Sequence, residues 1–345
     1  MSLPQLEKLS QVGAFEPTPS REWLSVWHVP FDSLCNNQKS EQALDKASRA
    51  KKRVVIMGAS GSGKSSMLAW AFRDEVAGLA PVRVRVAAEE HPVISKPGEF
   101  AAHLVETVAR QARLLSNKEA KQLTAPPGQQ TRTWAFKIGP PKWLLTGGVS
   151  REIVSVAERK PRSADQQIEI ARAVMKTISS KGLVPVLVVD DADQWLSGGD
   201  DDKLVADFFS RVMRVMCENL PAAIVVAANY RYLSIPGYQA AQDLLSTEID
   251  IPKVPLLGGM AKILEHRVEI ATETRDRGAL VTPGAQLADI MEDSAVETLA
   301  KIYRESKGSL RRTMGVAHRA LGAACEDEAD YITERQVRAA FAADL

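Results

Sequence analysis

One stretch of the chain decides its fold: Val54-Val55-Ile56-Met57-Gly58-Ala59-Ser60-Gly61-Ser62-Gly63-Lys64-Ser65-Ser66. It begins with apolar residues, continues as a glycine-rich turn and leads into the largely apolar sequence Met67-Leu68-Ala69-Trp70-Ala71-Phe72. Apolar runs on both sides of such a turn predict a strand, a loop and the start of a helix. Glycines let consecutive N–H groups face one anion, and the helix N-terminus adds partial positive charge at the same place.

The loop follows the spacing G-x-x-x-x-G-K-[ST] of the P-loop, or Walker A motif. This pattern indicates that Lys64 contacts the β- and γ-phosphates of a nucleotide and that Ser65 offers its hydroxyl to Mg²⁺. A chance match in a Gly/Ser loop is the alternative, which the flanking strand and helix disfavour. We therefore expect ATP and Mg²⁺ as cofactors, with the nucleotide bound by Gly58, Ser60, Gly61, Ser62, Gly63, Lys64, Ser65 and Ser66.

The composition is that of an ordinary globular protein and limits the possible functions. The 345 residues suit two domains, and 45% of them are hydrophobic while 25% are charged. Because the net charge is only +1, any contact with DNA must come from a local patch. Cys35, Cys217 and Cys325 lack metal-ligand spacing, and no apolar run is long enough to span a bilayer. We expect a cytoplasmic protein that makes no membrane contact.

A second motif follows an apolar strand pattern. The run Leu183–Val189 is apolar throughout and leads into Asp190 and Asp191. Such a run predicts a central strand covered on both faces, and open α/β sheets bind ligands at the carboxyl ends of their strands. We interpret the pair as a Walker B motif, in which Asp190 holds Mg²⁺ through water and Asp191 positions or deprotonates the attacking water. A solvated turn after a core strand is the alternative.

Strand and helix patterns alternate over much of the chain, which predicts a parallel sheet covered by helices. Strands are expected at 54–57, 81–87, 183–189 and 222–228, and helices at 40–51, 97–114, 164–181 and 203–219. Asn229 follows the last of these strands. Its amide would either orient the lytic water or cap the turn, and the pattern leaves both roles open.

Residues 116–165 interrupt this alternation with Pro-Pro and Gly-Gly pairs. We interpret them as an insertion that carries a hairpin. Basic and aromatic residues mix here, among them Arg132, Trp134, Lys137, Lys142, Trp143 and Arg151. The hairpin is therefore a candidate contact surface for a partner or for DNA, and a solvated loop that packs on its own core is the alternative.

The two ends of the chain have different patterns. We expect residues 1–20 to form a loosely attached arm, followed by an apolar cluster around Pro30 that packs on the core or covers the nucleobase. After Pro252 strand patterns stop, and helices are expected over about 259–274 and from Ser294, Gly308 and Thr333 onward. The predicted fold is an α/β P-loop NTPase with a parallel sheet, helices on both faces and a small all-helical lid. The predicted domains are an arm with its helix at 1–50, a core at 51–252 and the lid at 253–345.

These motifs, in this order, give a sequence that resembles the AAA+ ATPases. It is most similar to the branch that holds the origin-recognition and replication-initiator ATPases and the ATPase regulators of transposition. The resemblance covers about residues 40–345. It rests on Walker A, Walker B, Asn229 at the sensor 1 place, Gly308-Ser309-Leu310-Arg311 at the sensor 2 place, and a lid helix ending in Ile263-Leu264-Glu265-His266-Arg267.

The resemblance implies that ATP binds between the core and the lid. It implies that Arg311 reaches from the lid to the γ-phosphate and that Lys64, Asp191, Asn229 and Arg311 act together in catalysis. A helix-start arginine on the surface is the alternative for Arg311. The resemblance further implies that subunits assemble, as a ring or a filament, so that a neighbour completes each site.

Two features depart from the AAA+ pattern. The Walker B motif ends in Asp-Asp where Asp-Glu is usual, and the shorter Asp191 would stand farther from the water, so slow hydrolysis is expected. This acid pair is similar to that of the STAND signalling ATPases, the second family considered. In addition, no arginine stands where the trans-acting finger is usual: Arg231 comes too early after Asn229, and Arg211 and Arg214 are the other candidates.

The sequence therefore predicts an ATP-dependent AAA+ switch that oligomerises on ATP and engages DNA or a partner effector protein. The alternative is a STAND-like signalling scaffold that activates a partner without DNA. A metabolic P-loop kinase is the third hypothesis. It is disfavoured because such kinases have no counterpart of the predicted helical lid.

Overall fold

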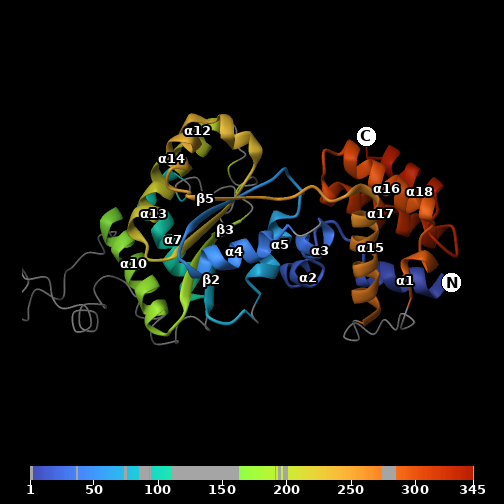
Figure 1. Cartoon of the computed structure of the whole chain (residues 1–345), viewed down its shortest axis with the longest axis horizontal. Helices are drawn as coiled ribbons and strands as arrows, with labels where there is room; N and C mark the ends of the chain where they lie inside the picture. The colour runs from blue at the N-terminus through green and yellow to red at the C-terminus, as the bar shows by residue number, and fades with distance from the viewer. Residues whose placement is uncertain are drawn as a thin grey trace, which may run out of the picture.

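The structure of the chain is a computed structural model, which describes residues 3–35, 38–73, 76–84, 93, 95–110, 163–190, 192, 196, 201–273 and 285–344. These residues form an α/β core and a helical lid that lie side by side, and an N-terminal arm that runs between them (Figure 1). The predicted fold class is confirmed. Asp191 and the hairpin predicted within residues 116–165 lie outside the described residues.

The core is built on a parallel sheet of five strands in the order β2-β3-β4-β1-β5. The strands are β1 (Arg53–Met57), β2 (Leu79–Val84), β3 (Val184–Val189), β4 (Ala223–Ala228) and β5 (Thr247–Asp250). Strand β5 was not predicted, because it is short and lies at the edge of the sheet, and Ile249 alone of its four residues is buried. Helical and strand periodicity cannot be separated over four such residues.

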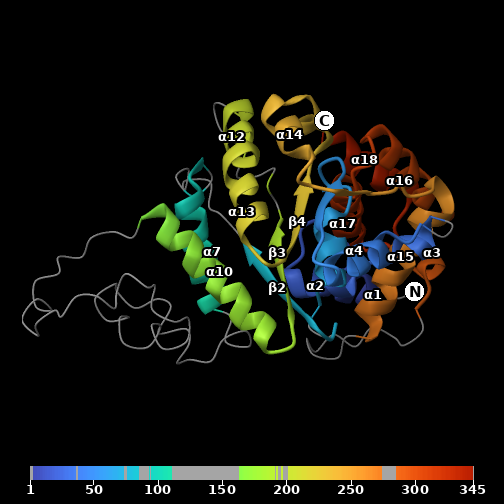
Figure 2. The same cartoon turned by 60° about the vertical axis from the view of Figure 1, so that its left-hand side comes forward.

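Helices cover both faces of the sheet, and the residues of β1 alternate between the two hydrophobic layers. Val54 and Ile56 belong to the layer with α4 (Ser40–Arg49) and α5 (Lys64–Ala71), whereas Val55 and Met57 belong to the opposite layer. Figure 2 shows the sheet between these two sets of helices. The opposite layer contains α7 (Pro97–Ala109), α10 (Ala164–Ser180), α12 (Asp201–Asp207), η3 (Phe208–Met213), α13 (Arg214–Asn219) and α14 (Pro236–Gln242).

The arm is firmly packed, so the expectation of a loosely attached segment at residues 1–20 was wrong. Its helices are α1 (Leu3–Val12), α2 (Arg21–Val26) and α3 (Phe31–Leu34). Leu6, Leu9 and Phe15 are fully buried, because α1 packs against two lid helices, α15 (Leu256–Glu273) and α17 (Leu310–Glu326). In contrast, α2 packs against α5 of the core. The arm therefore contacts both the lid and the core, and we keep the name arm for residues 3–35.

The lid consists of α15 (Leu256–Glu273), η6 (Leu287–Asp289), α16 (Asp293–Glu305), α17 (Leu310–Glu326) and α18 (Glu334–Ala342). Thr333 forms a capping box with Gln336 at the start of α18, as predicted. The helix expected from Ser294 begins at Asp293, and its N-cap residue is Glu292 rather than Ser294. The Glu292 carboxylate instead accepts a hydrogen bond from the Glu334 backbone, which joins the starts of α16 and α18.

Candidate functional site

The predicted phosphate loop connects β1 to α5 at the carboxyl edge of the sheet. Gly61 and Gly63 have φ angles of +74° and +106°, a backbone conformation that residues with side chains rarely adopt. A Cβ atom on Gly61 would lie 2.5 Å from Ser309 Oγ of the lid. Glycine at position 61 therefore permits both the turn of the loop and its close approach to the lid.

Lys64 is the buried cation of this loop. Its Nζ donates hydrogen bonds to the carbonyl oxygens of Gly58, at 2.7 Å, and Ala59, at 3.0 Å. These carbonyls compensate for the burial of the charge. Anionic phosphate oxygens are stronger acceptors than carbonyls, so Lys64 is placed to exchange these bonds for bonds to a nucleotide.

The two predicted magnesium ligands lie next to each other. Ser65 Oγ donates a hydrogen bond of 3.0 Å to Asp190 Oδ1, at the end of β3, and Asp190 is buried. Hydroxyl and carboxylate oxygens are ligands that Mg²⁺ prefers, and it commonly takes only one or two carboxylates beside substrate phosphates. The pair therefore fits Mg²⁺ held together with a nucleotide. Within the described residues, no group of three or more His, Cys, Asp or Glu side chains offers a separate metal site.

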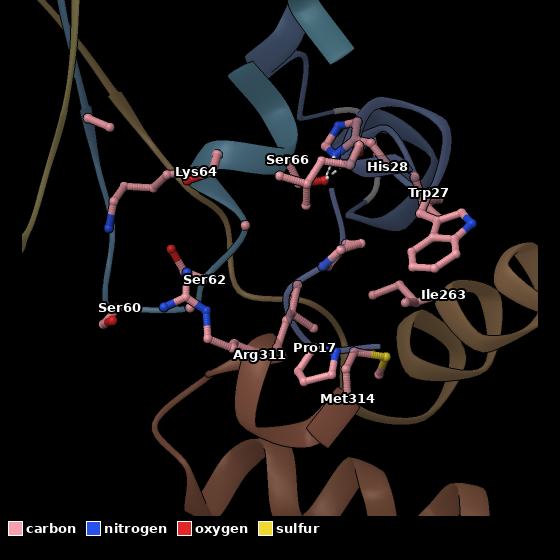
Figure 3. Close-up of a pocket in the computed structure, with 18 of the residues that line it drawn as sticks. Pro17, Trp27, His28, Ser60, Ser62, Lys64, Ser66, Ile263, Arg311 and Met314 are labelled. Carbon is pink, nitrogen blue, oxygen red and sulfur yellow. Dashed lines mark hydrogen bonds between the residues drawn. The ribbon is translucent and has the colours of Figure 1, made fainter. Parts of the chain in front are cut away.

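The lid reaches the phosphate loop through the first turn of α17. Arg311 N donates a hydrogen bond of 3.3 Å to Gly61 O. Ser309 caps this helix, because its Oγ accepts from Arg312 N at 3.3 Å. In Figure 3 the Arg311 side chain extends toward the loop near Ser62, and Arg311 lines the pocket although its side chain is exposed. The structure thus brings Arg311 together with the Walker A residues, as predicted.

A pocket extends from the loop toward the arm. It contains about 1080 Å³ of empty space, its open mouth included. Beyond the phosphate loop its walls are largely apolar, which suits a nucleobase. Among these wall residues are Leu24, Trp27, Val29 and Phe31 from the arm and Ile263, Leu310 and Met314 from the lid.

His28 also lines the pocket, and no role was predicted for it from the sequence. Its Nδ1 lies 2.9 Å from Ser66 Oγ on α5, and its Nε2 lies 2.9 Å from Glu41 Oε1 on α4. Both His28 and Glu41 are buried. Burial opposes the charge of Glu41, but hydrogen bonds from His28 and from Phe31 N outweigh it and lower the pKa of this carboxyl. No spacing in the sequence relates these residues, so no local pattern could have identified them.

Arg267 joins the lid to the arm. Its Nη1 donates to the carbonyl oxygens of Ala14, at 3.3 Å, and Glu16, at 3.1 Å, and its Cζ lies 4.8 Å from the centre of the Trp27 ring. Burial lowers the pKa of Arg267 to about 10, so the guanidinium stays charged at neutral pH. A cation stacked on an aromatic ring and bonded to two carbonyls fixes the arm to α15.

Asn229 lies at the carboxyl end of β4, directly before η4 (Tyr230–Ser234). Its Oδ1 accepts a hydrogen bond of 3.1 Å from Arg231 N, so the side chain caps this turn. The lining of the pocket, within the described part of the chain, does not include Asn229. The structure therefore places Asn229 at the predicted sheet edge, in the turn-capping role that the sequence had left open.

The candidate arginine fingers already have partners within the chain. Arg211 Nε lies 3.4 Å from Asp207 Oδ1, and Arg214 Nη2 donates a hydrogen bond of 2.7 Å to Ala240 O. Arg231 stacks on the Tyr232 ring at 5.2 Å. None of the three belongs to the pocket lining of the described residues, so the identity of a trans-acting arginine stays a prediction.

The family follows from a comparison with protein-family models. The model described as Novel STAND NTPase 1 (nSTAND1) matches residues 36–310, which is well over half of the chain. The chain belongs to this family. The match includes the phosphate loop, Glu41, Ser66 and Asp190, whereas His28 lies before its first residue. The STAND resemblance drawn from the Asp190-Asp191 pair is thereby confirmed, and the protein is an NTPase of this type.

The fold of this STAND NTPase is similar to that of origin-recognition proteins, the AAA+ branch that its sequence resembles. A structure of the Aeropyrum pernix ORC1 protein in complex with DNA matches with a TM-score of 0.52 and 15% identity, over 95% of this chain and 71% of that one. The Aeropyrum pernix ORC2 protein, in ADPNP-ADP complexes, matches with a TM-score of 0.51 and 16% identity, over 88% of this chain and 67% of that one. Such low identities establish the fold alone.

Two further findings concern curated relatives and membrane-spanning helices. A search of curated proteins gave no significant match. In the described part of the chain, every helix is too short or too polar to cross a membrane.

Proposed function

We propose that this STAND NTPase is a nucleotide-controlled switch, which binds ATP between core and lid and hydrolyses it slowly. The observation that carries the proposal is the hydrogen bond from Arg311 N to Gly61 O. It joins the lid to the loop that would bind the phosphates. A phosphate that changes the loop or attracts Arg311 would therefore change how the lid is held, and hydrolysis would reverse that change.

Each predicted residue has a place in this proposal. The loop amides, Lys64 and Arg311 bind the phosphates, and Ser65 and Asp190 hold Mg²⁺. When bound, Mg²⁺ neutralises negative charge on the phosphate oxygens. Asp191 positions the attacking water, and its short side chain makes hydrolysis slow. Asn229 keeps its Oδ1 bond to Arg231 N and would use its Nδ2 donors to orient the attacking water or contact the γ-phosphate.

We further propose that ATP binding promotes assembly of this chain and recruitment of a partner effector protein. Membership of the STAND family supports a signalling scaffold. In such a scaffold the nucleotide holds the protein closed, which agrees with a lid that is hydrogen-bonded to the phosphate loop. A second candidate is an assembly that grips DNA, which the likeness to the DNA-bound ORC1 protein favours at the level of fold.

The test is a measurement of particle mass for the Asp191→Asn variant with ADP, with ATP and Mg²⁺, and with duplex DNA added or omitted. Assembly with ATP alone supports the scaffold, and assembly that DNA enlarges supports the second candidate. Lys64→Ala should stay in the state without nucleotide. Identical masses under all conditions, with ATP binding verified, would overturn the proposed assembly.

A further inference from the structure

The imidazole of His28 connects a buried carboxylate to the first turn of the P-loop helix. It lies between Glu41 on α4 and Ser66 on α5, with 2.9 Å between heavy atoms on each side. Figure 3 shows the contact of His28 with Ser66 at the pocket wall, as a dashed line. His28 is 6% exposed and Glu41 is 3% exposed, so water cannot replace either contact. The ring is therefore the nearer of two partners of the Ser66 hydroxyl, because Ser66 Oγ also lies 3.4 Å from the acceptor Leu24 O.

The chemistry of the three groups restricts where their hydrogens can be. An ionised carboxylate only accepts hydrogen bonds, and Glu41 Oε1 already accepts one from Phe31 N. His28 Nε2 must therefore carry a hydrogen. If the ring is neutral, Nδ1 has none and can only accept the hydrogen of the Ser66 hydroxyl. If the ring is protonated, Nδ1 donates to Ser66 Oγ and the hydroxyl hydrogen is released.

This difference matters because Ser66 faces the pocket directly after Lys64 and Ser65. Phosphate oxygens accept hydrogen bonds, so Ser66 can bind a phosphate only with its own hydrogen. In the neutral arrangement that hydrogen is directed at the ring. In the protonated arrangement it can turn to Leu24 O, at 3.4 Å, or into the pocket, where a charged phosphate oxygen is the stronger acceptor. Glu41 from α4 is the charged group in contact with the ring, and the same pocket is lined by Lys64 of α5, Asp190 after β3, Arg267 of α15 and Arg311 of α17. The anionic nucleotide would add negative charge on the side of Ser66.

We propose that His28 is a positioning residue of the nucleotide site, which takes up a proton from solvent when a nucleoside diphosphate or triphosphate binds. The protonated ring donates Nδ1–H to Ser66 Oγ, keeps Nε2–H on Glu41, and so directs the Ser66 hydroxyl to a phosphate oxygen. Histidine is suited to this role because its charge changes within the physiological pH range. The inference rests on the proposed nucleotide binding at the P-loop, and it adds a proton to that binding reaction.

The experiment is titration calorimetry of the full chain with Mg·ADP at pH 7.5 in two buffers with different ionisation enthalpies. The difference between the two observed heats gives the number of protons taken up. We expect a clear fraction of one proton for the unaltered chain and a smaller number for His28→Gln, which keeps polar atoms near both neighbours. His103→Gln, on α7 at the other face of the sheet, is the matched control and should keep the full uptake. Protonation of the ADP phosphates is common to all variants and cancels.

A double-mutant cycle separates positioning from a structural role of His28. Ser66→Ala should weaken Mg·ADP binding about tenfold, because it removes a hydrogen bond to a charged group. His28→Gln should cost a similar factor alone and little more in the Ser66→Ala background. Adenosine, which has no phosphate, should bind equally to all four proteins.

The outcomes distinguish this inference from the proposed function. Failure of the unaltered chain to bind Mg·ADP overturns the P-loop proposal itself. Binding with equal proton uptake in the unaltered chain and in His28→Gln overturns only the role of His28, as do additive effects in the cycle. Thermal unfolding of each variant shows that it is folded, and Ser66→Ala, a small change at a half-buried site, keeps the test valid if His28→Gln does not fold.

Discussion

The two halves of the pocket are built in different ways. The phosphate half comes from the loop 58–66 and from Asp190, which follow two strands of one sheet. The arm half comes from the arm, 3–35, and from lid helices more than two hundred residues later in the chain. The first half is contiguous and depends on backbone geometry, whereas the second depends on packing between segments that have no common pattern. We therefore expect nucleotide binding and hydrolysis to depend on the phosphate half. The stability of the fold and the position of the lid should depend on the arm half.

The largest effect should follow from Lys64→Ala, in the phosphate half. Removal of the buried ammonium group should weaken ATP binding on the order of a thousandfold, because a charged hydrogen-bonded partner of the phosphates is lost. The fold should remain, since the small side chain leaves the loop glycines unchanged. Calorimetry measures the affinity, and Lys52→Ala, at an exposed lysine before β1, is the control. Unchanged ATP affinity would remove the P-loop assignment.

The next effect tests the arm half. Leu9→Ala should lower the free energy of unfolding by about 2–5 kcal/mol, because Leu9 is fully buried in the layer that α1 shares with the lid. Denaturant unfolding gives the change, and Glu7→Ala, at an exposed position on the same helix, should be nearly neutral. An unaltered unfolding curve for Leu9→Ala would mean that α1 does not pack on the lid in solution.

Arg311→Ala removes the side chain that extends from the lid toward the phosphate half and keeps the backbone hydrogen bond to Gly61 O. It should weaken ATP binding about tenfold and leave ADP binding nearly unchanged, because the side chain is expected at the terminal phosphate. ATP-dependent assembly should weaken with it. The matched control is Arg304→Ala, an exposed arginine on α16. Equal losses for ATP and ADP would place Arg311 at another phosphate.

The smallest effect concerns Glu41 and acid pH. Its pKa is lower in the folded chain than in the unfolded chain, so it contributes stability above its ordinary pKa of about 4.3 and loses that contribution as pH falls further. Glu41→Gln should therefore flatten the fall of thermal stability below about pH 4.3. The exposed Glu99→Gln serves as the control. A steeper fall in Glu41→Gln would contradict the direction of the shift.

Sequence patterns predicted the phosphate half well because each part of it is local. The glycine spacing predicted the phosphate loop. The apolar run that ends in two acids predicted a strand that places Asp190 at the same sheet edge as Ser65. Lid helices were found from their periodicity and from caps such as Thr333. Asp191 and the hairpin within 116–165 stay predictions, because both lie outside the described residues.

The arm half could not be predicted, for physical reasons. Burial of Leu6 and Leu9 depends on a surface that α17 supplies about three hundred residues later. The sequence pattern of a ten-residue amphipathic helix does not distinguish a helix packed on a distant segment from an exposed one. His28 and Ser66 are 38 positions apart and meet only because α2 packs on α5. The helix predicted at 203–219 was found in place, but its central part is the π-helical segment η3 (Phe208–Met213), a change of register that periodicity does not reveal.

The position of the arm has a consequence for timing. Arg267 holds the arm to the lid, while α2 holds it to the core, so a bound nucleotide would be enclosed by a segment that must detach before the pocket can open widely. Such detachment is a local unfolding event, and a nucleotide that leaves only through it exchanges no faster than the arm detaches. The dwell time of the nucleotide would then be a property of the arm, measurable as amide hydrogen exchange at residues 14–28. A partner that pulls on the arm would act as an exchange factor.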